Sequence, residues 1–377
     1  MIHAILSALI MICLALGLAA CDPTSVIEDL GTLRGPASLG LGINAAGNVC
    51  GASYLGPDPH TNGLHAFRYV DGLGMLDVGA LPPHNISEAQ GINRGGLVVG
   101  GSMVEGFVSH AFIASATLNL TDLGTLGGEY SYAWDINDMG VVSGEASSAT
   151  AGIHAFIWTS ASGMRDIGTL GGDTSTGRSI NESAQVAGDS RIGPGTVTRA
   201  FRFTEGVGMI SLGTLPGGTN SSAYGINNAG QVVGESETSP IVDPTPRLEG
   251  RALTPGFRLQ AFPFEGIHAF LWTEGAGMKD LGHLGGGKSR ALAISNKGMV
   301  VGTSTLIDGS NRAFRWTQAG GMMDLNTLLP RNSGWVLTAA WDVNDEGQIT
   351  GEGLHNGAQR AFRLNPPELV NEGSNVP

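Results

Sequence analysis

The chain has few cysteines, few basic residues and no helical pattern of useful length after its N-terminal segment. Only three of its 377 residues are cysteine, and two of them, Cys13 and Cys21, lie at the apolar N-terminal end. If Cys13 leaves with a cleaved leader and Cys21 becomes the new N-terminus, Cys50 is the one cysteine left inside the fold. We therefore expect no intramolecular disulfide in the mature protein.

Basic charge is scarce as well. Lys and Arg number 20 against 33 Asp and Glu, which gives a net charge of −13, and the sequence contains no block of Lys or Arg. All charged residues follow Ala20, so this charge belongs to the mature chain. Phosphate contacts need clustered positive charge, so nucleic acid and anionic lipid headgroups are poor partners for this surface.

Apolar runs long enough to cross a bilayer are absent after residue 20. Residues 1–20 contain no Asp, Glu, Lys or Arg and end in small residues before Cys21. This pattern predicts a signal peptide of the lipoprotein type, with Cys21 lipidated and residues 21–25 as a tether. An ordinary signal peptide or an uncleaved anchor is the alternative. We expect an extracytoplasmic protein, in the periplasm or at the cell surface, anchored to a membrane without spanning it; free secretion is the alternative.

What the chain does contain is a repeat, and its sixty glycines fall largely at fixed places in it. Each unit holds three phrases in order, with variants in some units: Gly-Ile-Asn-x-x-Gly, then His/Arg-Ala-Phe, then Asp-Leu-Gly-Thr-Leu-Gly-Gly. The phenylalanines that end the second phrase are 45, 44, 45, 69, 44 and 48 residues apart: Phe67, Phe112, Phe156, Phe201, Phe270, Phe314 and Phe362. A period in the mid-forties made of short strands is typical of propeller blades or solenoid coils.

One unit, residues 132–168, shows the order of its strands. Its four apolar segments are about five residues long, the usual strand length. Asn137 and Gly140 suit the first and last positions of a type I turn between the first two segments. Turn signals separate each pair, so we predict four antiparallel strands per unit, which make one propeller blade.

The two ends of the chain distinguish a closed ring from an open solenoid. Residues 26–31 form a lone fourth strand with no blade before it, whereas the last blade, residues 340–364, has three strands and no fourth. Pairing them would remove two free edges. We therefore predict an all-β fold, a seven-bladed β-propeller over residues 26–364 that the N-terminal strand closes, followed by a tail at residues 365–377.

These phrases also carry a family resemblance. From about residue 27 to residue 362 the chain resembles the HAF-repeat family of bacterial extracellular proteins. The resemblance implies secretion and a repeated β-architecture. It brings no characterised activity and no set of catalytic residues.

The fifth blade contains an insertion of about 24 residues, near residues 237–266. It is rich in proline and holds Asp243, Phe257, Phe262 and Phe264. Variable loops on a rigid scaffold are where function concentrates, so these residues form a candidate binding loop. The same aromatic cluster could instead cap the ring or pack on blade five, and both alternatives stay open.

The His of His-Ala-Phe invites a metal or catalytic interpretation, but three blades have Arg there: Arg199, Arg312 and Arg360. Arginine neither ligates metals nor acts as a base at ordinary pH, so we predict a hydrogen-bonding role beside a carboxylate of an adjacent strand. The Asp of Asp-Leu-Gly suits a turn, where its side chain accepts backbone N–H groups. Calcium binding is the alternative, but further oxygen ligands are missing. We predict no metal and no cofactor.

Two other residue types have predicted places. Trp158, Trp272 and Trp316 follow the Ala-Phe pair by two residues and should pack between blades. The other tryptophans are less defined, and on the innermost strand Trp134 and Trp341 could face either the core or a central channel. Cys50 stands where other repeats have valine, so we predict a buried strand position.

Nucleophile elbows, zinc-binding motifs and phosphate loops are all absent from the sequence. Every blade follows one consensus, and we see no polar constellation that breaks it. We therefore favour a binding scaffold for an extracytoplasmic polysaccharide or protein over an enzyme. The alternative is a propeller glycan hydrolase or lyase that uses loop carboxylates from different blades, with candidates at Asp58, Glu105, Glu129 and Asp243.

Overall fold

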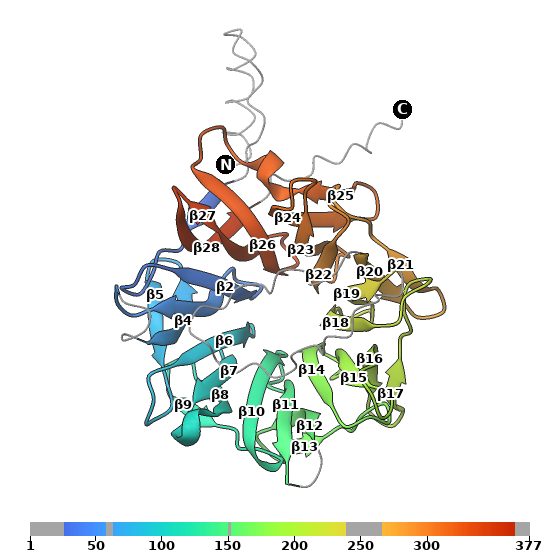
Figure 1. Ribbon diagram of the computed structural model, residues 1–377. Helices are drawn as coiled ribbons and strands as arrows, with labels where there is room; N and C mark the ends of the chain where they lie inside the picture. The colour runs from blue at the N-terminus through green and yellow to red at the C-terminus, as the bar shows by residue number, and fades with distance from the viewer. Residues whose placement is uncertain (1–25, 58–62, 150–151, 239–265, 366–377) are drawn as a thin grey trace, which may run out of the picture.

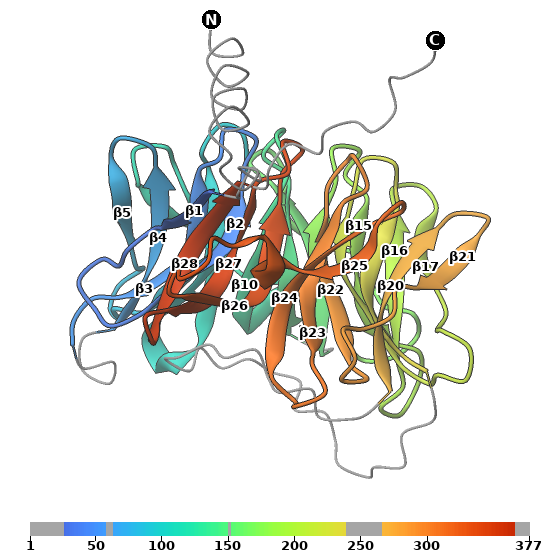
Figure 2. The ribbon, with the colours of Figure 1, turned by 90° about the horizontal axis from the view of Figure 1, so that it is seen from above.

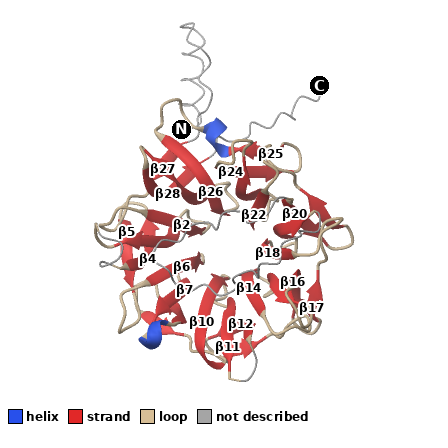
Figure 3. Cartoon of the chain, in the orientation of Figure 1, coloured by secondary structure: helices blue, strands red, loops and turns tan. Residues whose placement is uncertain are grey.

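The computed structural model describes residues 26–57, 63–149, 152–238 and 266–365. Seven four-stranded antiparallel sheets stand in a ring (Figure 1), and the view turned by 90° shows that the ring is a disc (Figure 2). Strands dominate the described residues (Figure 3), beside two short 3₁₀ helices, η1 (Glu105–Phe107) and η2 (Leu325–Leu328). The predicted seven-bladed β-propeller is confirmed.

Each blade uses its first strand as the innermost and its fourth as the outermost. Blades one to three comprise β2 (Ser38–Ile43), β3 (Val49–Tyr54), β4 (Leu64–Val70) and β5 (Gly74–Gly79); β6 (Ser87–Ile92), β7 (Val98–Met103), β8 (Ser109–Ala114) and β9 (Leu120–Asp122); β10 (Gly127–Ile136), β11 (Val142–Ser148), β12 (Ile153–Thr159) and β13 (Gly163–Asp166). Blades four to six comprise β14 (Ser175–Ile180), β15 (Val186–Arg191), β16 (Thr198–Thr204) and β17 (Gly208–Ser211); β18 (Ser221–Ile226), β19 (Val232–Glu237), β20 (Ile267–Thr273) and β21 (Gly277–Asp280); β22 (Ser289–Ile294), β23 (Val300–Thr305), β24 (Asn311–Thr317) and β25 (Gly321–Asp324).

Blade seven is built from both ends of the described chain. Its strands are β26 (Trp335–Val343), β27 (Ile349–His355), β28 (Ala358–Asn365) and β1 (Val26–Asp29), and β1 pairs antiparallel with β28. In Figure 1 the blue β1 lies beside the red β28. Side chains reinforce the pairing, because Arg363 Nη2 lies 2.8 Å from Glu28 Oε2. The predicted closure by the N-terminal strand is confirmed, and it leaves β28 without a free edge.

The core lies between the blades. The seven phenylalanines of the repeat are all 0% exposed. Trp272 packs in a cluster with residues of blades four and five, and Trp316 in the corresponding cluster of blades five and six. Trp158 packs against the cluster between blades two and three. The predicted inter-blade role of these three tryptophans is confirmed, as is the burial of Cys50, which raises the pKa of its thiol.

The asparagine of each Gly-Ile-Asn-x-x-Gly phrase joins neighbouring blades. Asn137 Oδ1 accepts the N–H groups of Met139 and Val141 at 3.1 and 2.9 Å, which is the turn role that the sequence predicts. Its Nδ2 also donates to the carbonyl of Asn181 in the next blade, at 3.1 Å. We call the resulting ring of inter-blade bonds the asparagine belt. Its donors are Asn44, Asn93, Asn137, Asn181, Asn227 and Asn344.

The belt has one gap among the seven blades. Blade six has Ser295 at this position, and no hydrogen bond joins its side chain to the carbonyl of Asn344 in blade seven. Blades six and seven are joined by hydrogen bonds from N and Nδ2 of Asn296 to Asp345, at 2.7 and 2.9 Å, and by the apolar cluster that contains Val301, Leu325 and Leu337. The ring is therefore fastened in the same way at six of its seven seams.

Candidate functional site

The histidines of the repeat each pair with the aspartate of the adjacent outer strand. The Nδ1 atoms of His65, His110, His154 and His268 lie 2.7–2.8 Å from Asp77, Asp122, Asp166 and Asp280. Each of these aspartates also accepts the N–H of the glycine two residues later. Both predicted roles, the His–carboxylate bond and the turn, are confirmed.

The four His–Asp pairs do not converge on one site, although the histidine lowers the pKa of its aspartate in the pairs of Asp77 and Asp280. Burial alone would raise the pKa of Asp280, but the hydrogen bonds from His268 and Gly282 and the nearby imidazoles hold it below its ordinary value. Each pair lies between the third and fourth strands of its own blade, so the pairs are spread around the perimeter. In the described ranges no group of three or more His, Cys, Asp or Glu side chains is placed to hold a metal ion. No helix of the described chain is long and apolar enough to cross a membrane.

The innermost strands carry a different kind of feature, a β-bulge at the same place in every blade. The bulged residue lies two positions before the Ile or Val of the Gly-Ile-Asn phrase. A bulge breaks the alternation of a strand and re-aims a side chain. We call these seven residues the channel row: Leu41, Gln90, Trp134, Arg178, Tyr224, Leu292 and Trp341.

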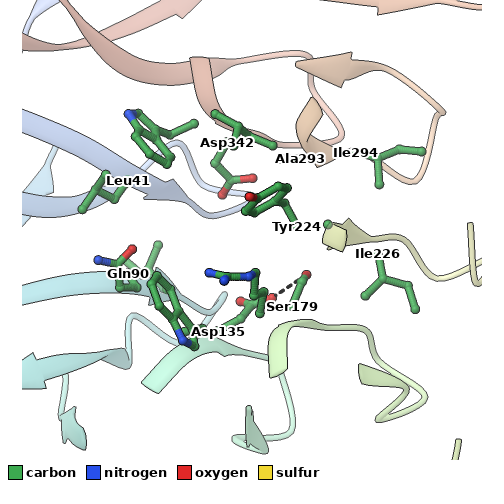
Figure 4. Close-up of a pocket in the computed structure, with 16 residues that line it drawn as sticks. Leu41, Gln90, Asp135, Ser179, Tyr224, Ile226, Ala293, Ile294 and Asp342 are labelled. Carbon is green, nitrogen blue, oxygen red and sulfur yellow. Dashed lines mark hydrogen bonds between the residues drawn. The ribbon is translucent and has the colours of Figure 1, made fainter. Parts of the chain in front are cut away.

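All seven residues of the channel row line one cavity of about 200 Å³, the channel pocket (Figure 4). Trp134 and Trp341 therefore face the channel, which the sequence left undecided. The remaining lining residues are close neighbours on the same strands, among them Asp135, Ser179 and Asp342. Unlike the perimeter pairs, these side chains come together at one place from different blades.

Arg178 is held in the channel pocket by an ion pair and by two aromatic rings. Its Nε lies 2.6 Å from Asp189 Oδ1 on β15. Its guanidinium carbon lies 5.2 Å from the ring centroid of Trp134 and 5.1 Å from that of Tyr224. Burial alone would lower the pKa of Arg178, but Asp189 and the neighbouring groups raise it, so the guanidinium is charged and clamped between two aromatic rings.

A row of acids on the second strands supports this side of the pocket. In blades three, four, five and seven the residue after the strand's glycine is acidic: Glu145, Asp189, Glu235 and Glu352. Glu145 accepts hydrogen bonds from Tyr130 and Thr176 at 2.7 and 2.6 Å. Glu235 accepts from Tyr224 at 3.0 Å and from Arg290 at 2.7 Å. Blades one, two and six have Ala52, Gly101 and Thr303 at the equivalent position. Three consecutive blades, three to five, therefore form a continuous acidic wall, and blade seven adds a separate acid.

Two carboxylates line the pocket itself, Asp135 in blade three and Asp342 in blade seven, on opposite sides (Figure 4). Asp135 Oδ2 accepts the N–H of Ile180 in blade four at 3.0 Å, and Asp342 Oδ2 accepts the N–H of Ile43 in blade one at 2.8 Å. Burial raises the pKa of Asp135 to about 6 and that of Asp342 to about 7, although these N–H bonds oppose the shift. Each carboxylate thus fastens a seam between blades and also faces the channel.

The sequence prediction that no polar constellation breaks the consensus was wrong. The three repeated phrases cover turns, strand ends and core positions, but they do not include the channel row. A comparison of these phrases therefore does not show that the channel position varies. Aligning the units at the position two before the Ile or Val would have shown Leu, Gln, Trp, Arg, Tyr, Leu and Trp in order. That disagreement between repeats is the signal that locates the pocket.

The other predicted site residues lie elsewhere. Cys21 and the candidate binding loop of Asp243, Phe257, Phe262 and Phe264 fall outside the described residues, as does Asp58. Glu105 and Glu129 are exposed, and neither lines the channel pocket. Among the residues that the structure describes, it therefore groups none of the carboxylates proposed for a loop-based hydrolase.

Neither a protein-family model nor a curated protein matches this sequence. Similar solved structures include TolB from Acinetobacter baumannii, with 10% identity, a TM-score of 0.45, and coverage of 85% of this chain and 63% of that one. They also include the gluconolactonase XC5397 from Xanthomonas campestris, with 10% identity, a TM-score of 0.39, and coverage of 92% and 96%. A puromycin-hydrolyzing peptidase of Mycobacterium tuberculosis has 11% identity, a TM-score of 0.51, and coverage of 89% and 53%.

The chain spans about 63% of TolB and about half of the peptidase, and at these identities the likeness concerns the fold alone. Fold and site together define a β-propeller scaffold with a pocket at its centre.

Proposed function

We propose that the protein is a non-catalytic binding scaffold that holds one unit of an extracytoplasmic polysaccharide in its channel pocket. The observation that carries this proposal is the channel row, where seven otherwise similar blades place Trp134, Arg178, Tyr224 and Trp341 around one cavity. Ligand pockets combine aromatic walls with a few well-placed polar groups, which is the composition found here.

The size of the pocket supports a small, ring-sized unit. Its volume of about 200 Å³ is below the roughly 300–1,000 Å³ typical of sites for drug-sized ligands. A folded protein partner would need a broad surface of about 800 Å² on each side instead. A sugar ring has an apolar C–H face for an aromatic wall and hydroxyl groups for Arg178 and the two aspartates. This chemistry favours a glycan over a protein.

The alternative, a glycan hydrolase, rests on Asp135 and Asp342. A carboxyl group with a pKa of about 6 or 7 could serve as a general acid near neutral pH. However, both carboxylates accept N–H groups from the adjacent blade, and this structural use favours the scaffold. Enzyme and scaffold differ in one observable, the release of new chain ends.

We further propose that the protein acts outside the cytoplasm, that Cys21 anchors it to a membrane through lipid, and that it is a member of the HAF-repeat family. The leader pattern of residues 1–20 and the repeated phrases support these three proposals. A membrane tether would present the pocket to envelope or environmental glycans. Labelling of Cys21 by a fatty-acid analogue in cells, lost in Cys21→Ser, would test the anchor.

The test of the function is a binding assay on residues 22–377 with a panel of cell-envelope and plant polysaccharides. We expect at least one polysaccharide to bind, by calorimetry or by retardation in an affinity gel, without release of reducing ends or unsaturated products. Release of chain ends would replace the scaffold with the hydrolase or lyase. Absence of binding across the panel would contradict the glycan proposal.

A further inference from the structure

The channel pocket presents both hydrogen-bond donors and acceptors to a ligand, and the negative charges around it outnumber the positive ones. Arg178 uses Nε for Asp189, and among the described residues its two Nη groups have no hydrogen-bond partner. Gln90 donates through Nε2 to Tyr132 at 2.7 Å, so its carbonyl oxygen is left for the pocket. The pocket thus offers the two NH2 groups of Arg178 as donors on one wall, and acceptors at Gln90 and at the two aspartates.

The guanidinium is already neutralised before any ligand enters. Asp189 lies against Nε, and Glu145 is close enough to contribute to the raised pKa of Arg178. Glu235 is neutralised by Arg290 in the same way. Asp135 and Asp342 then add negative charge directly at the pocket, and among the described residues neither is bonded to a cation. An anionic ligand would meet more negative than positive charge at short range, in a partly desolvated site where Coulomb repulsion is strong.

Resting on the glycan-binding function proposed above, we propose that the channel pocket selects a neutral, hydroxyl-rich sugar unit and rejects the corresponding sugar acid. Arg178 is the specificity-determining donor. Its Nη groups donate to ligand hydroxyls, and the aspartates accept from them. The rings of Trp134 and Tyr224 hold the guanidinium in place from both sides, so little freedom is lost when the hydroxyls bind.

The geometry explains why Arg rather than Lys occupies this place. The planar guanidinium can bond Asp189 along one edge and still present two nitrogens at fixed angles to a ligand. A lysine ammonium at residue 178 could keep the ion pair with Asp189 but would lose the fork and the stacking on two rings. Arg178→Lys therefore separates the role of the charge from the role of the donors.

The experiment compares matched ligands on residues 22–377 at pH 7.5. Each pair consists of a neutral oligosaccharide and its counterpart with a C6 carboxylate on the terminal unit, in gluco, galacto and manno forms. For the stereoisomer that binds, we expect the neutral form to bind at least about tenfold more tightly than its acid. Equal or tighter binding of the acid would overturn the inference and leave the glycan-binding function standing. Absence of binding by every glycan, both here and in the polysaccharide panel, would overturn the function itself.

Variants test the role of Arg178 on the same ligands. We expect Arg178→Lys to weaken binding of the neutral ligand at least tenfold, while the melting temperature changes little. Arg165→Lys is the matched control, because Arg165 is exposed and pairs with Glu205 away from the pocket; its affinity should be unchanged. Full affinity in Arg178→Lys would overturn the donor role. If that variant does not fold, the ligand pairs on the unaltered protein still decide the selectivity for neutral sugar.

Discussion

The perimeter and the channel of this propeller use the same repeat in opposite ways. At the perimeter, the His–Asp pair recurs in four blades with nearly the same distance, and at the seams the buried phenylalanine recurs in all seven. In the channel row, the residue changes from blade to blade between aliphatic, amide, aromatic and cationic. Positions where the repeats agree hold the ring together, and positions where they disagree form the pocket.

Blade four shows that a residue pair at the perimeter can change while its structural role is kept. There the pair at the perimeter is Arg199 and Ser211, and Arg199 bonds the carbonyl of Thr219 rather than a carboxylate. The ring tolerates this exchange because any donor that ties the third strand to its surroundings serves the purpose. In the channel row, by contrast, each side chain contributes its own part of the wall of one pocket. Substitutions should therefore affect stability at the seams and affinity at the channel.

The largest expected effect is on a seam. Phe156→Ala removes a fully buried ring and should reduce the free energy of unfolding by about 3–5 kcal/mol, because it leaves a cavity between blades two and three. Urea unfolding measures the change. A loss below about 1 kcal/mol would contradict the idea that the repeated phenylalanine holds the blades together.

The second prediction concerns pH and the two pocket aspartates. The pKa of each folded carboxyl lies above 3.8, so the native state keeps its protons to higher pH than the unfolded chain. Their contribution to stability should therefore fall as pH rises from about 4 to about 7, by a few kcal/mol, since one pKa unit corresponds to about 1.4 kcal/mol. Chemical unfolding of Asp342→Asn at several pH values checks this. The stability of the wild type relative to the variant should decline across that window, and a constant difference would contradict the prediction.

The third prediction is on the asparagine belt. Asn181→Ala removes the turn bonds to Ser183 and Gln185 and the bond to the carbonyl of Asn227, which should cost about 2 kcal/mol. Ser295→Asn supplies the missing donor between blades six and seven and should add about 1 kcal/mol. Thermal unfolding of both variants tests the belt from two directions. Destabilisation by Ser295→Asn would show that the gap is required by local packing.

The smallest effect is at the turn of blade four. The last residue of the Asn-x-x-Gly turn has a positive φ, and blade four places Ala184 there with φ 54° where other units have glycine, such as Gly140 with φ 78°. Ala184→Gly should relieve the left-handed strain and stabilise the protein by about 1 kcal/mol or less, since glycine also gains entropy when unfolded. A melting temperature of Ala184→Gly below that of the wild type would contradict the inference that Ala184 is strained.

Sequence reasoning reached the fold because the information there is local and repeated. The blade count follows from the phrases, and the closure from the lone strand at residues 26–31 and the three-stranded last blade. The pairing of His65 with a carboxylate on the next strand follows from a position that accepts both His and Arg. Each of these inferences depends only on contacts between neighbouring strands, within one blade or between two adjacent blades.

The channel pocket could not be predicted in the same way. Trp134 and Trp341 lie at β-bulges, where the alternation that sorts strand residues into faces fails, so their direction was undecided. The pocket also requires side chains from blades that are far apart in sequence, and only the closed ring sets their distances. Arg178 gave no signal by itself, because its meaning depends on Trp134, Tyr224 and Asp189 around it.

The measurement that tests the central claim is the affinity of Trp134→Leu for whichever polysaccharide the wild type binds. Leucine is what blades one and six have in the channel row, so this change makes blade three resemble those two blades at this position. We predict at least a tenfold loss of affinity with little change in melting temperature. Trp158→Leu is the control: it should lower the melting temperature through lost inter-blade packing and leave the affinity unchanged. Unchanged affinity in Trp134→Leu would contradict the account, because the disagreement between repeats would then not mark the binding site.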